Sequence, residues 1–228
     1  MLIRHPSVKL RQGIYVGGEV HGSFPRPLEY FLGIPYALPT SGPRRFAPPV
    51  RILEQSNEIF NAVKYGSRCP STESLSITQY ADEDCLNLNL YRPRQAGENE
   101  NAKLPVVVYI HGGSFNFGYA GDRAIHNMIA WSSEPIIGIT FNYRLGALGF
   151  LPSKLTAELG LLNVGLKDQI ALLQWVQENI SSFGGDPNNI TLMGLSAGAH
   201  SVSRILTSYQ LLKFPYLYSH PNILQFIT

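Results

Sequence analysis

FGGDPNNITLMGLSAGAH, residues 183–200, is the stretch around which the rest of this chain is organised. Residues 190–193 combine β-branched and apolar side chains, which is typical of a buried strand. Residues 197–208 are compatible with a helix. Ser196 is therefore predicted to lie on the turn between a strand and a helix.

The spacing Gly194-x-Ser196-x-Gly198 suggests what this serine could do. Glycines on either side allow the strand and the helix to approach closely, while the tight turn exposes the serine oxygen as a nucleophile. The N–H of Ala197 opens the predicted helix and would point at an oxyanion formed beside Ser196. Taken alone, the five residues are equally compatible with a glycine-rich turn that carries no chemistry.

Further elements of the same architecture lie upstream. Residues 105–110 and 136–140 are β-branched runs, typical of strands covered on both faces of a parallel sheet, and the polar stretch 122–131 between them is partly helical. Residues 166–180 repeat apolar side chains every three or four positions, which predicts an amphipathic helix packed on the sheet, with Trp175 on its inner side. This alternation of strands and helices predicts an α/β fold.

The remaining segments carry weaker signals. Residues 13–50 are rich in glycine and proline and favour hairpin strands and turns, and residues 51–80 are expected to be loop with at most a short helix. Residues 83–93 alternate apolar and polar side chains, which predicts a strand with one buried face. Residues 94–104 are expected to form a surface loop.

A glycine-rich segment follows the predicted strand 105–110. It begins HGGS at residues 111–114 and continues with Gly118 and Gly121. Such a segment can turn backbone N–H groups toward a ligand, because glycine has no Cβ in the way. A phosphate-binding loop is the rival interpretation, but the segment lacks both the lysine of a Walker A motif and the glycine spacing of a dinucleotide fingerprint.

Composition excludes several classes of function. The 228 residues are 44% hydrophobic and carry a formal net charge of +2, which gives no reason to expect nucleic acid or an anionic membrane as partner. No apolar run is long enough for a membrane-spanning helix. Two cysteines are too few for a cysteine-built zinc site, and no histidine pair has metal spacing, so we expect no metal and no cofactor. Cys69 and Cys85 are compatible with one disulfide or with two free thiols.

Several stretches together resemble the type-B carboxylesterases, the cholinesterase-like branch of the α/β-hydrolases. They are FGG at 183–185 with ITLMGLSAG at 190–198, FLGIPYA at 31–37, RFAPP at 45–49, EDCLNLNLYRP at 83–93, and GLKDQ at 165–169 with WVQENI at 175–180. The resemblance spans residues 13–207. It implies an α/β-hydrolase fold, of which the chain would be the amino-terminal part of the mostly parallel central sheet with its flanking helices, truncated shortly after the serine turn. Residues 1–209 would belong to that domain, and residues 210–228 form a tail without family resemblance.

The resemblance also implies roles for individual residues. Ser196 would attack a carboxylic ester and form an acyl-enzyme, while the backbone N–H groups of Gly113, Ser114 and Ala197 would form the oxyanion hole. In this family the first cysteine position pairs with the second, here Cys69 with Cys85. The histidine that opens the glycine segment, His111, is structural in the family. Leu195 departs from the Glu or Gln that many relatives carry before the serine, which puts a preference for cationic substrates in doubt.

The other members of a catalytic triad are missing from the pattern. A serine hydrolase needs a histidine base and a carboxylate that orients it, and in this fold both follow the nucleophile. No acidic residue follows Ser196; the last one is Asp186. Of the two later histidines, His200 would point along its helix rather than back at the serine, and His220 lies in the tail. We therefore expect weak or no activity from the chain as written, and an exposed sheet edge that permits self-association.

Two hypotheses follow. The chain is either a carboxylic ester hydrolase acting on a small-molecule or lipid ester, or a non-catalytic fragment or cholinesterase-like interaction protein. The first 13 residues contain no apolar segment of a signal peptide. A cytoplasmic location is thus expected as written, and secretion if the true start lies upstream.

Overall fold

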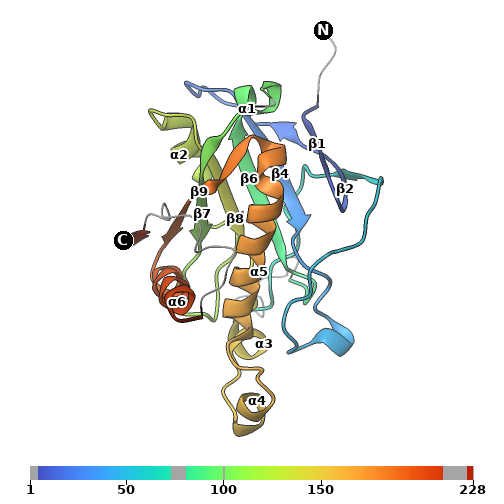
Figure 1. Cartoon of the computed structure of the whole chain (residues 1–228), viewed down its shortest axis with the longest axis vertical. Coiled ribbons are helices and arrows are strands. Elements are labelled where there is room, and N and C mark those ends of the chain that lie inside the picture. The colour runs from blue at the N-terminus through green and yellow to red at the C-terminus, as the bar shows by residue number, and fades with distance from the viewer. Residues whose placement is uncertain (1–4, 73–80, 100, 213–224, 228) are drawn as a thin grey trace.

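A computed structural model describes residues 5–72, 81–99, 101–212 and 225–227. Its centre is a seven-stranded sheet in the order β10-β9-β7-β8-β6-β4-β3 (Figure 1). The strands are β3 (Gly18–Glu19), β4 (Leu28–Pro35), β6 (Asn87–Pro93), β7 (Leu104–Ile110), β8 (Ile137–Phe141), β9 (Gly185–Gly194) and β10 (Gln225–Ile227). A smaller sheet contains β1 (Ser7–Leu10), β2 (Gly13–Val16) and β5 (Ile59–Asn61) in the order β1-β2-β5.

The central sheet is mixed. β7 pairs in parallel with both β8 and β9, and β10 is parallel to β9. The amino-terminal strands β3, β4 and β6 instead pair antiparallel, and β6 joins the parallel half through β8. Parallel pairing therefore holds from β8 to β10, and the carboxyl ends of β7, β8 and β9 meet at one edge of the sheet.

Helices cover both faces of the sheet. Their bounds are α1 (Arg94–Glu98), α2 (Ile125–Trp131), α3 (Gly146–Phe150), α4 (Lys154–Glu158), α5 (Val164–Asn179) and α6 (Ala197–Leu212), with short 3-10 turns at Gly42–Arg44 and Ile180–Phe183. The larger apolar core lies under α5 and α6, and the smaller one under α2. Alternate residues of β7 serve the two cores, Val108 the first and Tyr109 the second.

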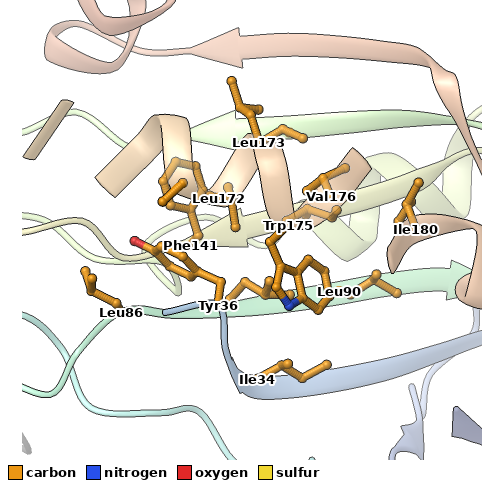
Figure 2. Packing of buried hydrophobic residues seen from close by; sticks show 14 of the residues in the cluster. Ile34, Tyr36, Leu86, Leu90, Phe141, Leu172, Leu173, Trp175, Val176 and Ile180 are labelled. Atoms are coloured by element: carbon orange, nitrogen blue, oxygen red, sulfur yellow. The ribbon is translucent and has the colours of Figure 1, made fainter. Parts of the chain in front are cut away.

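α5 packs its inner face on the sheet, as its apolar spacing predicts. In Figure 2, Leu172, Trp175 and Val176 point from the helix toward residues of β4 and β6, among them Ile34 and Leu90. Trp175 is only 5% exposed. Its indole N–H donates to Gln12 in the turn between β1 and β2, so the helix also fixes the smaller sheet.

Some local predictions are wrong. All seven residues of β6 are buried, whereas the alternating sequence predicts one buried face. The polar positions are accommodated by hydrogen bonds: the Asn89 side chain accepts from the N–H of Gly33 and donates to Thr140. The short helix α1 occupies part of the expected loop 94–104, and β5 forms inside the expected loop 51–80, whose described residues contain no helix.

The outer edge of β9 differs from the expectation as well. The expectation is that the strand before the serine turn forms an uncovered edge, but β10 pairs with β9 along Leu192, Met193 and Gly194. The tail thus contributes a strand directly beside the serine turn. In the described part of the chain, no helix is both long and apolar enough to cross a membrane.

Candidate active site

Ser196 lies on the turn between β9 and α6, where the sequence places it. Its φ angle is 54°, in the left-handed region that a residue with a Cβ adopts only at a cost. The turn is closed by two backbone hydrogen bonds, from the Gly198 N–H to the Leu195 carbonyl (2.8 Å) and from the His200 N–H to the Ser196 carbonyl (3.0 Å). Ser196 is exposed while Ala197 and Gly198 are buried, so the turn presents the serine to solvent.

The two glycines of the turn are required by close backbone contacts. A methyl group on Gly194 would lie 2.4 Å from the carbonyl carbon of Gly198. A methyl group on Gly198 would lie 2.0 Å from the carbonyl oxygen of Ile110, the last residue of β7. β9, α6 and the end of β7 therefore contact one another through backbone atoms, without side chains between them. These contacts fix the position of Ser196 relative to the loop that follows β7.

That loop, residues 111–120, lies against the serine turn. A methyl group on Gly112 would be 2.7 Å from the Leu195 carbonyl oxygen and 3.3 Å from Cβ of Ser196. Gly113, Ser114 and Phe115 have φ angles of 108°, 53° and 60°, three consecutive residues in the left-handed region. Such a run of unfavourable backbone conformations persists only where the surroundings hold it, and it is frequent at functional sites.

Two peptide groups of this loop, Gly112–Gly113 and Gly113–Ser114, are fixed by hydrogen bonds to their carbonyl oxygens. The Gly112 carbonyl is bonded by Nδ1 of His111 (2.9 Å), and the Gly113 carbonyl accepts from the N–H groups of Asn116 and Phe117 (2.9 and 3.0 Å). In a trans peptide the N–H points opposite to the C=O. The N–H groups of Gly113 and Ser114 are thus directed away from these partners, and within the described residues neither donates to another group. They are oriented, unoccupied donors.

His111 is buried in the loop and is held neutral. Its ring stacks on Tyr143 with the centroids 4.3 Å apart, and only 1% of the residue is exposed. Burial lowers the pKa of His111 to about 4, although the hydrogen bond to the Gly112 carbonyl acts in the opposite direction. Because a carbonyl only accepts, Nδ1 carries the proton, and Nε2 has no hydrogen-bond partner among the described residues. This environment suits the structural role that the sequence resemblance implies for His111.

The described residues provide no base for the serine. Across the described ranges, no hydrogen bond joins the Ser196 hydroxyl to a histidine or a carboxylate. His200 is exposed on α6, and His220 lies outside the described residues. No group of three or more His, Cys, Asp or Glu side chains in the described part of the chain could hold a metal ion.

Cys69 and Cys85 form a disulfide in the structure, with their Cα atoms 4.9 Å apart and both side chains buried. The segment before the bridge contacts the glycine loop: the Arg68 guanidinium lies 3.3 Å from the centre of the Tyr119 ring. Three residues after Cys69, the Thr72 N–H donates to the Asn116 carbonyl in the glycine loop (3.2 Å). The disulfide therefore fastens a segment that packs beside the candidate site.

Sequence reasoning missed the residues that follow β8. Asn142, Tyr143 and Arg144 are at most 3% exposed, and all three make buried polar contacts. Arg144 forms an ion pair with Asp168 of α5 (Nη2 to Oδ1, 2.6 Å). The only available signal was the run of polar residues directly after an apolar strand, which by itself resembles any surface turn.

Comparisons with known proteins agree on one family. The sequence model of the carboxylesterase family matches residues 4–214. The chain is 41% identical over 196 residues to the para-nitrobenzyl esterase of Bacillus subtilis, covering 83% of this chain and 39% of the relative. It is 43% identical over 202 residues to a carboxylic ester hydrolase of Bombus ignitus, covering 86% and 35%. Among solved structures, EstA of Aspergillus niger matches with a TM-score of 0.77 and 36% identity, over 87% of this chain and 37% of EstA.

These matches confirm the predicted α/β-hydrolase fold and the resemblance that the sequence motifs indicate. The chain spans less than half the length of each of these relatives.

Proposed function

Since the chain belongs to the carboxylesterase family, we propose that it carries the nucleophile and the oxyanion donors of a carboxylic ester hydrolase. Ser196 attacks the ester carbonyl and forms an acyl-enzyme, releasing the alcohol. The N–H groups of Gly113, Ser114 and Ala197 stabilise the negative charge that develops on the carbonyl oxygen. The substrate is a small-molecule or lipid ester.

The observation that carries this proposal is the contact between the serine turn and the glycine loop. A Cβ at Gly112 would lie 2.7 Å from the Leu195 carbonyl oxygen, too close for any residue but glycine, and 3.3 Å from Cβ of Ser196. Gly112 thus lies against the exposed Ser196, and the two residues that follow it carry backbone N–H groups that are free among the described residues, which supports their assignment as oxyanion donors. Preorganised donors of this kind contribute about 3 to 4 kcal/mol each to transition-state stabilisation in serine proteases.

The proton transfers need two further groups. A histidine must accept the proton of Ser196 and a carboxylate must orient that histidine. The described residues hold neither in contact with the serine, so both are expected outside the described part of this chain. Without them, oxyanion donors and binding alone support only roughly 10³- to 10⁴-fold acceleration over water, as in triad-deleted proteases.

The test is covalent capture followed by mass spectrometry. Extract from the natural source is treated with a fluorophosphonate probe, and the peptide containing Ser196 is examined together with the intact mass of the labelled species. Labelling of Ser196 supports the nucleophile assignment. Labelling on a species well above 25.3 kDa would show that this serine reacts within a longer polypeptide, which has room for the groups that transfer the proton.

Two controls make the test decisive. The purified 228-residue chain is assayed with para-nitrophenyl butyrate beside the Ser196→Ala variant. A rate that is the same in both proteins contradicts the proposed nucleophile. A 25.3 kDa species that is present in extract but never labelled favours the alternative, a non-catalytic member of the family that acts by binding.

A further inference from the structure

One short segment, residues 142–146, contacts the glycine loop 111–120 at three places. Three consecutive residues of the loop have left-handed backbone angles, and two of them, Ser114 and Phe115, carry a Cβ. Each such residue costs on the order of 1 kcal/mol or more. The loop therefore needs external contacts to keep the conformation that leaves its donors free.

The contacts occur at both ends and in the middle of the loop. At the start, the Tyr143 hydroxyl donates to the His111 carbonyl (2.9 Å) and its ring stacks on the His111 ring. At the end, the Ala120 N–H donates to the Asn142 side-chain oxygen (2.8 Å). In the middle, the Gly146 N–H donates to the Phe115 carbonyl (2.7 Å).

The holding segment is itself anchored to rigid parts of the fold. Arg144 donates to Asp168 of α5 through Nε, Nη2 and its backbone N–H, and to the Ala47 carbonyl through Nη1. Nδ2 of Asn142 donates to the Ser67 carbonyl, two residues before the disulfide. The segment thus connects the loop to α5 and to the disulfide-bonded region at the same time.

We propose that Tyr143 and Asn142 are positioning residues, which clamp the two ends of the oxyanion loop and thereby set the direction of the Gly113 and Ser114 N–H groups. The inference rests on the proposed function, in which these two N–H groups stabilise the oxyanion. Tyr143 acts through His111: it holds the ring that bonds the Gly112 carbonyl, and that carbonyl shares its peptide plane with the Gly113 N–H. Both side chains are buried, so they act through the loop.

The test uses amide hydrogen exchange and amide resonances, which are readable without substrate and therefore independent of whether the chain hydrolyses any ester. In Tyr143→Phe, the Asn116 and Phe117 amides, both bonded to the Gly113 carbonyl, should exchange roughly tenfold faster, the effect of losing one buried hydrogen bond. The Gly113 and Ser114 amide resonances should shift or broaden. Amides of β7 and β9 serve as the reference for global unfolding.

Tyr15→Phe is the matched control. It removes the same hydroxyl from another buried tyrosine, whose oxygen accepts a 3.0 Å hydrogen bond from Gln12 in the smaller sheet. Its loop amides should stay within about twofold of the parent after correction for global stability. Equal acceleration in both variants, or an unchanged loop in Tyr143→Phe, overturns the proposal. Should Tyr143→Phe not fold, Asn142→Ala decides by the exchange of the Ala120 amide, which should accelerate, whereas no change there also overturns it.

Discussion

The buried His111 should make the protein lose stability as the pH falls below neutrality. Its pKa is lowered to about 4 by burial, whereas an unfolded histidine titrates near 6.5. The unfolded chain therefore binds a proton in this window that the folded chain resists. The stabilisation is fully present above pH 6.5 and is lost as the pH falls toward 4.

The magnitude follows from the two pKa values. Relative to pH 7.5, the contribution of His111 to the free energy of unfolding falls by about 2 kcal/mol at pH 5 and about 3 kcal/mol at pH 4. Such a loss is a large part of the total for a marginally stable domain. Protonation would also place a charge in the loop beside the oxyanion donors, so the conformation of the loop should change over the same range.

The assay is urea unfolding at pH 7.5, 6, 5 and 4 for the parent and for His111→Gln, whose amide can still donate to the Gly112 carbonyl but does not titrate. Other groups titrate in both proteins, among them His126, whose pKa is also lowered by burial, and they cancel in the difference. The stability difference should shrink by about 2 kcal/mol between pH 7.5 and 5. A difference that is independent of pH, or a His111 resonance titrating near 6.5, would refute the reasoning.

Three further predictions concern the serine turn and the buried ion pair. Ser196→Gly should raise the free energy of unfolding by about 1 kcal/mol, since glycine adopts the φ of 54° without a Cβ penalty; unchanged stability in urea would contradict strain at the turn. Gly198→Ala should lower the free energy of unfolding by about 3 kcal/mol, because the new methyl group would lie 2.0 Å from the carbonyl oxygen at the end of β7. The control is Gly160→Ala, at a glycine with positive φ and open space around it, which should lower the free energy of unfolding by about 1 to 2 kcal/mol. Asp168→Asn should lower it by about 3 to 5 kcal/mol, because the Arg144 charge is left unpaired in the core; a double Arg144→Met, Asp168→Leu variant as unstable as the single one would argue against that cause.

The parts of the fold that follow from local pattern were predictable from the sequence. β7 begins one residue before the predicted strand, and β8 begins and ends one residue after its prediction. α5 begins two residues before the predicted helix and ends one residue before the predicted end. Continuous apolar runs and a three-and-four spacing determine such elements locally. β6 was misjudged, because hydrogen bonds such as those of Asn89 bury polar residues that a pattern assigns to the surface.

The candidate site divides in the same way. The serine turn follows from the spacing of two glycines around Ser196, which a sequence displays directly. The role of Tyr143 does not, because it depends on contact with His111, 32 positions earlier. Such pairings are set by the order of strands in the sheet, here by the adjacency of β7 and β8, and no local propensity encodes them.

The segment 142–146 also bears on engineering this fold. Transplanting the serine turn and the glycine loop into another scaffold would move both chemical parts and leave behind the side chains that keep the loop in shape. A portable version of the site has to include the residues after the neighbouring strand, together with the acidic partner on the helix that anchors them. The smallest transferable unit is therefore three strand ends with the helices α5 and α6, not two loops.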